Sequence, residues 1–395
     1  MSGPPPLYLA PVTLLTPTGP VADGALLTAG ARIAALGPAA HVPRPPDARV
    51  LDSAGHLLAP GFLDLQLNGA FGYDFTADPA SIWAVGARLP RSGVAAFLPT
   101  IISSSPATIA AAQAVMRAGP PPGYRGATAL GLHLEGPFLN PVRRGAHDPA
   151  YLRPPDPVLA AGWSPATGVR LVTLAPELPG ALDLVRALVA RGVVVSAGHS
   201  AATLAEALAG FAAGISYGTH LFNAMPPLHH RAPGLAGALL TDPRPTVGLI
   251  ADGVHVDPAL VALVWRAKGP RHLNLVTDAI AALDMPPGVY RIGDRAVHVD
   301  GTAARLPDGT LAGSLLSLDQ AVRNFVAWTG ADPAAAVATV TAVPADLLGL
   351  GGGRGRLAPG AAADLVLLTP DLRVATAIVG GEVVYAARPG LMPPP

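Results

Sequence analysis

The chain has 395 residues, 50% of them hydrophobic, with 26 Lys or Arg and 26 Asp or Glu, so its formal net charge is zero. Its length and apolar content allow a large core, in two or three domains or in one barrel that uses most of the chain. The neutral balance gives no electrostatic case for nucleic acid or an acidic membrane surface. The chain contains no cysteine, so a metal would need nitrogen and oxygen ligands.

No targeting or membrane-spanning segment is expected. Residues 1–6 are rich in proline and lack the basic segment and apolar stretch of a secretory signal. The long alanine-rich stretch Leu204–Ala213 is interrupted by Glu206, and no apolar run reaches the roughly 18 residues of a membrane span. We therefore expect a cytoplasmic enzyme without a membrane partner.

Both ends of the chain are predicted to form short strands separated by turns. The expected strands are Leu7–Leu15, Ala25–Leu27, Arg32–Leu36, Asp364–Leu368, Val374–Val379 and Val383–Tyr385. Gly380 and Gly381 predict a tight turn before the last strand. We expect the two ends, residues 1–57 and 355–395, to form one small β-sandwich domain.

The middle of the chain, residues 58–354, alternates short apolar runs with helix-like stretches. The eight runs are Phe62–Leu67, Val94–Leu98, Ala127–Leu134, Leu171–Leu174, Val193–Ala197, Ile215–Tyr217, Val247–Ala251 and Leu273–Thr277. The clearest helical stretches are Leu182–Ala190 and Leu204–Phe211. This alternation predicts an α/β fold, a (β/α)8 TIM-like barrel whose strands are continuously apolar because both faces are buried.

Polar residues lie at or just after the C-terminal end of seven of these runs. In chain order they are Gln66, Asn68, Glu135, Glu177, His199, His220, Asp252, His255 and Asp278. Barrel active sites are built at this end of the strands. Singly, each residue has an ordinary alternative, such as a turn glutamate, a satisfied core histidine or a carboxylate at a helix N-terminus. Unrelated structural roles would not converge on one rim, so we favour an active site.

The residue types at the rim point to metal-assisted hydrolysis. Glu135, His199 and His220 offer one carboxylate and two imidazoles, a set that suits a divalent metal such as zinc, iron, manganese or cobalt. Asp278 would then be a general base. Many barrel hydrolases hold a second metal with His-x-His at the first strand, where this chain has Gln66 and Asn68. Neutral amides are poor ligands beside imidazole, so we expect one metal, most simply zinc.

A set of longer motifs runs in order along nearly the whole chain. They are Pro-Gly-Phe-Leu-Asp-Leu-Gln-Leu-Asn-Gly (60–69), His-Leu-Glu-Gly-Pro-Phe-Leu-Asn (133–140), Gly-His-Ser (198–200), Thr-His-Leu-Phe-Asn-Ala-Met (219–225), Pro-Gly-Leu-Ala-Gly (233–237), Asp-Gly-Val-His (252–255), Thr-Asp-Ala (277–279) and Leu-Ala-Gly-Ser (311–314). In order and spacing these motifs resemble the N-acetylglucosamine-6-phosphate deacetylase family of the amidohydrolase superfamily.

The resemblance implies a role for each matching residue. It implies that Glu135, His199 and His220 are metal ligands, that Asp278 is the catalytic acid/base, and that His147 positions and polarises the acetamide carbonyl. The residues implied to contact the substrate are Ala146, His147, Asn223, Ala224, Arg231, His255, Leu311, Ala312, Gly313 and Ser314. Arg231 would reach the phosphate bound by a neighbouring subunit, which implies a homodimer.

The implied reaction is metal-dependent deacetylation of N-acetyl-D-glucosamine 6-phosphate to D-glucosamine 6-phosphate and acetate, by a metal-activated water with Asp278 as general acid/base. Two alternatives are kept. The chain could deacetylate another N-acetylated hexosamine phosphate, such as the galactosamine epimer, or form a barrel that binds a sugar phosphate without catalysis. The second needs neither Asp278 nor a complete set of metal ligands, so an enzyme is favoured.

Overall fold

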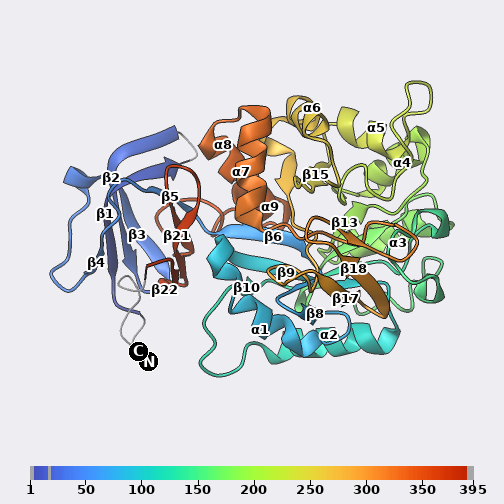
Figure 1. Ribbon diagram of the computed structural model, residues 1–395, viewed down its shortest axis with the longest axis horizontal. Coiled ribbons are helices and arrows are strands. Elements are labelled where there is room, and N and C mark those ends of the chain that lie inside the picture. The colour runs from blue at the N-terminus through green and yellow to red at the C-terminus, as the bar shows by residue number, and fades with distance from the viewer. Residues whose placement is uncertain (1–3, 17–18, 389–395) are drawn as a thin grey trace.

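The computed structural model describes residues 4–16 and 19–388, and every structural statement below concerns these residues. Two bodies lie side by side in Figure 1: a small β domain built from the first and last described strands, and a larger barrel domain. The outermost residues predicted for the small domain, 1–3 and 389–395, lie outside the described residues.

The small domain is built on one eight-stranded sheet drawn from both ends of the chain. Its order is β22-β21-β20-β5-β1-β2-β3, and β4 also pairs with β1. The strands are β1 (Leu7–Thr16), β2 (Gly19–Ala29), β3 (Arg32–Pro38), β4 (Arg49–Leu51), β5 (Leu57–Pro60), β20 (Leu365–Leu368), β21 (Val374–Val379) and β22 (Glu382–Ala386). Leu9, Leu26, Leu58 and Leu365 share one buried cluster, so residues more than 300 positions apart form a single core. The division at residues 57 and 355 stays a prediction.

The barrel has eight parallel strands, neighbours in chain order. They are β6 (Phe62–Leu67), β9 (Val94–Ile102), β11 (Leu132–Glu135), β12 (Val169–Leu174), β13 (Val194–Ala197), β14 (Tyr217–Gly218), β15 (Thr246–Leu249) and β16 (Leu273–Leu275). A parallel bridge between Leu67 and Ala279 joins the last strand end to the first. All nine residues of β9 are buried, as expected for strands covered on both faces. The predicted TIM-like barrel is therefore confirmed.

Helices cover the outside of the barrel. They are α1 (Ile82–Gly86), α2 (Pro106–Ala118), α3 (Ala181–Ala190), α4 (Leu204–Ala213), α5 (Gly234–Thr241), α6 (Pro258–Lys268), α7 (Leu318–Thr329), α8 (Pro333–Ala338) and α9 (Ala342–Leu347). The two helices expected from the sequence are α3 and α4. Thr203 and Glu206 form a capping box that fixes the start of α4. Among the described residues, no helix has the length and apolarity needed to cross a membrane.

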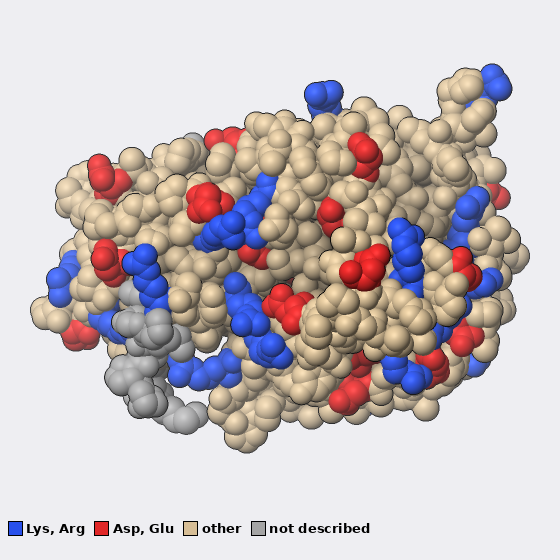
Figure 2. All heavy atoms as spheres, viewed as in Figure 1, with Lys and Arg blue, Asp and Glu red and all other residues tan. Residues whose placement is uncertain are grey.

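Shorter elements complete the chain. They are β7 (Gly69–Ala70), β8 (Tyr73–Asp74), β10 (Thr128–Ala129), and the 3-10 turns η1 (Ala39–His41), η2 (Pro79–Ser81), η3 (Leu89–Ser92), η4 (Pro141–Arg143), η5 (Pro149–Tyr151), η6 (Pro165–Thr167) and η7 (Gly269–Arg271). On the face shown in Figure 2, acidic and basic side chains are interspersed, in keeping with the neutral net charge.

One part of the fold was not expected from the sequence. Between β16 and α7 the chain forms a three-stranded antiparallel sheet of β17 (Gly288–Ile292), β18 (Arg295–Val299) and β19 (Ala304–Arg305). Its buried side chains Ile292 and Val297 pack against Ile280, two residues after Asp278. The sheet therefore lies against the end of the barrel where the rim residues were predicted.

The junction of the two domains depends on the carboxylate of Asp364, which is 6% exposed. It pairs with the Arg354 guanidinium and accepts a hydrogen bond from the Gly380 N–H. Its backbone carbonyl accepts one from Gly61, which links β5 to the first barrel strand. Because removal of one partner leaves a partly buried charge unpaired, we expect Asp364→Ala to lower the free energy of unfolding by about 3 kcal/mol in urea denaturation.

The matched control for this change is Asp371→Ala. Asp371 also pairs with an arginine, Arg373, but both side chains are mostly exposed. An exposed pair contributes little, so the urea midpoint should not move. Equal losses in the two variants would contradict the assignment of Asp364 as the junction residue.

Candidate metal centre and substrate cavity

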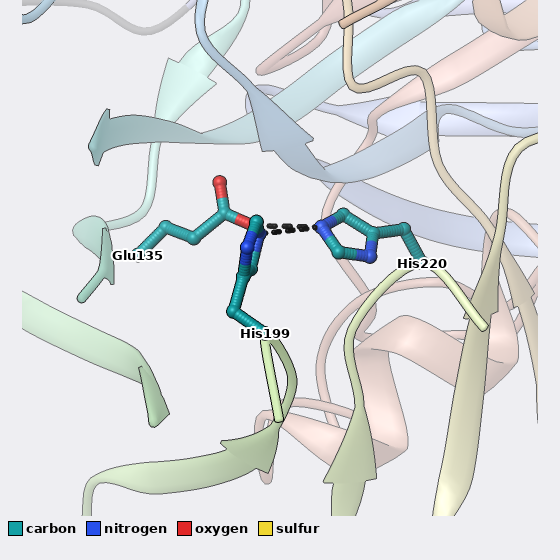
Figure 3. A group of neighbouring side chains, drawn as sticks. All are labelled: Glu135, His199 and His220. Carbon is teal, nitrogen blue, oxygen red and sulfur yellow. Dashed lines mark hydrogen bonds and ion pairs between the residues drawn. The ribbon is translucent and has the colours of Figure 1, made fainter. Parts of the chain in front are cut away.

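Three buried side chains converge on one point at the C-terminal end of the barrel (Figure 3). Glu135 ends β11, His199 lies two residues beyond β13, and His220 lies two residues beyond β14. Glu135 Oε1 lies 3.1 Å from His199 Nε2 and 3.0 Å from His220 Nε2, and the two nitrogens are 3.0 Å apart. Ligand atoms about 2.0 Å from a tetrahedral ion lie roughly 3.3 Å apart, so the three atoms fit one divalent metal.

The electrostatics of the group favour a positive charge at this point. Burial alone would raise the pKa of Glu135, but its contacts with His199 and His220 hold that pKa well below its usual range. Burial would likewise lower the pKa of His220, but the Glu135 carboxylate raises it. A buried carboxylate that draws a proton onto its neighbouring imidazole is a site where a divalent cation can take the proton's place.

The orientation of His199 also suits a metal ligand. Its Nδ1 lies 2.9 Å from the backbone carbonyl oxygen of Arg143, so Nδ1–H donates there and the Nε2 lone pair faces the other two side chains. His220 Nδ1 has no hydrogen-bond partner among the described residues.

The strand ends that carry these residues turn in an unusual way. His199, His220 and Asp278 all have positive φ, 49°, 29° and 49°. Residues with a Cβ adopt this left-handed conformation at a cost of about 1–2 kcal/mol. Such strain persists where surrounding contacts enforce it, and it gathers at functional sites. Here it turns side chains from three separate strands towards one centre.

Asp278 is joined to the group through the two amides of the first strand. Gln66 Nε2 donates to Glu135 Oε1 at 3.0 Å and to Asp278 Oδ1 at 3.1 Å, and Asn68 Nδ2 donates to Asp278 Oδ1 at 2.7 Å. Because the amide nitrogens face the carboxylates, Gln66 and Asn68 act as donors here and not as ligands. Burial and the nearby Glu135 raise the pKa of Asp278 to about 6. Among the described residues, the Glu135 group is the metal-ligating cluster found.

His147 lies beside the group, with Nε2 3.9 Å from Glu135 Oε2. Its Nδ1 accepts a hydrogen bond from the Ser103 N–H at 3.2 Å and lies 2.9 Å from the Ser103 hydroxyl. This places the proton of the neutral ring on Nε2. Burial and the neighbouring His199 lower the pKa of His147 to about 3, so the ring is neutral. Ser103 follows β9, the one strand to which no rim residue was assigned from the sequence.

A cavity of about 430 Å³ opens over these side chains. The residues predicted from the sequence that line it are Glu135, Ala146, His147, His199, His220, Asn223, Ala224, His255, Asp278, Leu311 and Gly313. Ala312 and Ser314 are buried beside it. Ser314 donates to the Thr277 carbonyl and its N–H to the Asp278 carbonyl, so it supports the strand end that carries Asp278.

Arg231 is the predicted residue that lies away from the cavity within one chain. It is exposed on the segment between β14 and α5, and its guanidinium contacts the neighbouring His230. In Figure 1 this segment extends outwards beyond α4 and α5. A role for Arg231 at a substrate site therefore requires a second copy of the chain, and stays a prediction.

Three residues in or beside the cavity, Arg143, Arg144 and Ser103, were not singled out from the sequence. Arg143 and Arg144 bring two positive charges to its wall, directly before the Gly-Ala-His segment that carries His147. Asp252, named from the sequence as a rim residue, accepts the Nδ1–H of His255 at 2.7 Å, which leaves Nε2 of that ring for the cavity. The Arg-Arg pair could have been found as a cationic signal next to a predicted site residue. Ser103 could not, because serine after a strand is common.

Comparison with known proteins places the chain in a family. The model of the amidohydrolase family matches residues 57–384. The chain belongs to the amidohydrolase family. It is 43% identical over 352 residues to human N-acetylglucosamine-6-phosphate deacetylase, with 85% of each chain covered. It is 38% identical over 381 residues to an Escherichia coli O157:H7 N-acetylgalactosamine-6-phosphate deacetylase, covering 94% of this chain and 97% of the relative.

A solved structure has the same fold over the whole length. The N-acetylglucosamine-6-phosphate deacetylase of Pasteurella multocida superposes with a TM-score of 0.90 at 31% identity, covering 96% of this chain and 100% of that one. The family resemblance inferred from the motifs is thus confirmed.

The geometry of this amidohydrolase centre predicts the effect of removing one ligand. Because His199 supplies one of three converging atoms, His199→Ala should lower bound zinc after dialysis from about one ion per chain to less than about 0.2. The measurement is metal content by mass spectrometry, with exposed His41→Ala as the control. Full occupancy in His199→Ala would remove His199 from the ligand set.

Proposed function

We propose that this amidohydrolase family member is a metal-dependent deacetylase that hydrolyses N-acetyl-D-glucosamine 6-phosphate to D-glucosamine 6-phosphate and acetate. The observation that carries the proposal is the joining of Asp278 to the buried Glu135–His199–His220 group through Gln66, inside one cavity. A general base beside a metal centre is the arrangement that amide hydrolysis by water requires.

Glu135, His199 and His220 would hold one divalent metal ion per subunit, most simply zinc. Bound there, the metal lowers the pKa of water and polarises a carbonyl group. The other catalytic roles are assigned to side chains of this protein. The two amides at the first strand hold Asp278 in place through their nitrogens, and a neutral amide is a poor metal ligand beside imidazole, which supports one metal and not two.

Asp278 is proposed as the general acid/base. Its carboxylate accepts the proton of the attacking water and then delivers that proton to the amine nitrogen as the C–N bond breaks. The raised pKa suits this double role, because the group can be ionised before attack and protonated afterwards. Asn68 and Gln66 both donate to Oδ1, which leaves Oδ2 as the oxygen free to carry the proton.

His147 is proposed to hold the acetyl carbonyl oxygen. Its Nε2–H is the donor that the Ser103 contact leaves available, and the ring stays neutral near pH 7. A fixed donor stabilises the negative charge that develops on this oxygen as water adds.

The phosphate is proposed to bind at the far side of the cavity, near Asn223, Ala224 and His255. The phosphate takes no part in the chemistry, and its binding energy holds the acetamide in place. We further propose a cytoplasmic homodimer in which Arg231 of one subunit reaches the phosphate bound by the other, since a guanidinium can bind phosphate through two hydrogen bonds.

The main alternative is the same reaction on the galactosamine epimer. It is supported by the similarity to an N-acetylgalactosamine-6-phosphate deacetylase. The glucosamine substrate is favoured because relatives named for it reach higher identity. A non-catalytic sugar-phosphate barrel would need neither a complete ligand group nor a base beside it.

The direct test is acetate release by the zinc-loaded protein. We expect kcat/KM for N-acetylglucosamine 6-phosphate to exceed that for the galactosamine epimer, and that for the unphosphorylated sugar, by at least about tenfold, since each lost contact of this kind costs about 1.4 kcal/mol or more. Asp278→Asn is the control. It should keep its zinc and lose turnover.

Each outcome of that assay bears on one proposal. Faster release from the galactosamine epimer would overturn the substrate assignment. Normal turnover by Asp278→Asn would overturn the assignment of the base. No acetate from any of the three sugars would favour a binding protein.

A second prediction concerns His147. Because His147→Ala removes one donor to the developing oxyanion, kcat should fall about 100- to 1000-fold while zinc content stays unchanged. Steady-state kinetics with metal analysis on the same sample would measure both. An unchanged kcat with a raised KM would limit His147 to substrate binding.

A further inference from the structure

Glu177 is a rim residue that the proposed mechanism does not use. It follows β12, and it is absent from the lining of the substrate cavity. Both of its carboxylate oxygens are engaged. Oε1 accepts from Asn140 Nδ2 at 2.9 Å and from the Ala201 N–H at 2.6 Å, and Oε2 accepts from the Ser200 hydroxyl at 2.7 Å. One carboxylate thus joins the segments that follow β11 and β13.

The segment that follows β13 contains the candidate ligand His199. Ser200 and Ala201 follow it directly, so Glu177 holds the backbone immediately after a left-handed residue. A side chain held at such a φ needs contacts that keep its backbone from relaxing. The Glu177 carboxylate supplies two of these contacts.

The segment that follows β11 contacts His199 from the other side. The Asn140 N–H donates to the His199 carbonyl at 3.0 Å, and Asn140 Oδ1 accepts from the Val142 N–H at the start of η4. Arg143, at the end of η4, accepts the Nδ1–H of His199 at 2.9 Å. The hydrogen bonds therefore form a closed ring that runs from Glu177 through Asn140 and η4 to His199 and back through Ser200.

We propose that Glu177 is a positioning residue for the metal centre. Its carboxylate fixes the ring around His199, so that His199 Nε2 meets Glu135 Oε1 and His220 Nε2 without rearrangement. This inference rests on the proposed metal-dependent function. It assigns Glu177 no contact with substrate or metal, since its two oxygens are already bonded to the two segments.

Two simpler roles for Glu177 do not account for its contacts. It does not cap the next helix, because α3 begins at Ala181 after Gly180. Nor does it pair with a cation among the described salt bridges, so it does not serve as half of an ion pair. The Glu177 carboxylate accepts from three neutral donors, and two of them belong to the residues just after His199. This arrangement indicates that Glu177 fixes the backbone geometry around His199.

The test measures zinc affinity of metal-stripped full-length protein by competition with a chromophoric chelator. Glu177→Ala should bind zinc about 10- to 100-fold more weakly than the native chain, as loss of a partner that orients a ligand does. Glu177→Gln keeps one acceptor oxygen and should lie between the two. At low zinc the kcat of Glu177→Ala should fall and recover when zinc is raised, with KM unchanged at saturation.

The matched control is Glu206→Ala. Glu206 is also a glutamate that accepts from a loop backbone N–H, but it caps α4 through Thr203 and contacts none of residues 199–201. It should lower the melting temperature and leave zinc affinity unchanged. Hydrogen exchange at residues 138–147 and 199–202 should rise in Glu177→Ala and not in Glu206→Ala.

The outcomes separate this inference from the proposed function. If the native chain binds no zinc, the proposed function fails. If the native chain binds zinc and Glu177→Ala binds it equally well, the positioning role fails. Should Glu177→Ala not fold, Ser200→Ala removes the Oε2 contact together with the acceptor of the Ala202 N–H, and leaves both Oε1 contacts. Native zinc affinity in both Ser200→Ala and Glu177→Gln would overturn the inference.

Discussion

The rim of this barrel depends on one buried carboxylate oxygen. Glu135 Oε1 contacts Gln66, His199 and His220, and the residue is 3% exposed. An ionised carboxylate in such a place costs several kcal/mol unless donors or cations surround it. The compensating groups come from the ends of β6, β13 and β14. The paths of four strands out of the barrel are therefore set by the need to bring their side chains to a single atom, and the shape of the substrate cavity follows from those paths.

The left-handed backbone at the strand ends follows from the need to bring these side chains to Glu135. A residue of positive φ turns the chain sharply within one position. His199, His220 and Asp278 all use this turn. The strain is borne because each residue is held from both sides. The Asp278 N–H donates to the Gln66 carbonyl, and the Asp278 carbonyl accepts from Ser314. The same contacts join the last barrel strand to the first, so the hydrogen bonds that close the barrel also hold Asp278 in place.

Much of the fold and of the candidate site could be predicted from the sequence. The parts that could not be predicted have physical explanations. Apolar runs buried on both faces are distinctive, so the barrel and its C-terminal rim could be predicted. Ligand residue types are few, so Glu135, His199 and His220 could be singled out, and the structure brings them together, while their role as metal ligands stays a proposal. The β17–β19 sheet was missed although Gly293-Asp294 lies at a turn between alternating residues, because strands of five residues or fewer with exposed faces give a weak pattern. Ser103 and the Asn140–Glu177 contact were missed because serine, asparagine and glutamate are ordinary loop residues and the contact spans 37 positions. The proposed role of Arg231 requires a second copy of the chain, and the pattern of a single chain does not reveal contacts between copies.

Two supporting residues, Ser103 and Glu177, act on the same loop. β9 and β12 are the two neighbours of β11 in the sheet, and their ends carry Ser103 and Glu177. Ser103 holds His147, and Glu177 holds Asn140, so residues 140–147 of the loop after β11 are fixed at both ends. Neighbouring strands lie about 4.8 Å apart, which puts such side chains within reach of a loop that rises between them. Within residues 140–147 regular structure is limited to the three residues of η4, so their conformation is set by these flanking contacts and not by their own propensity. Because contacts outside the cavity hold this loop, a cavity-facing residue such as Arg144 can be replaced without loss of the geometry at His147.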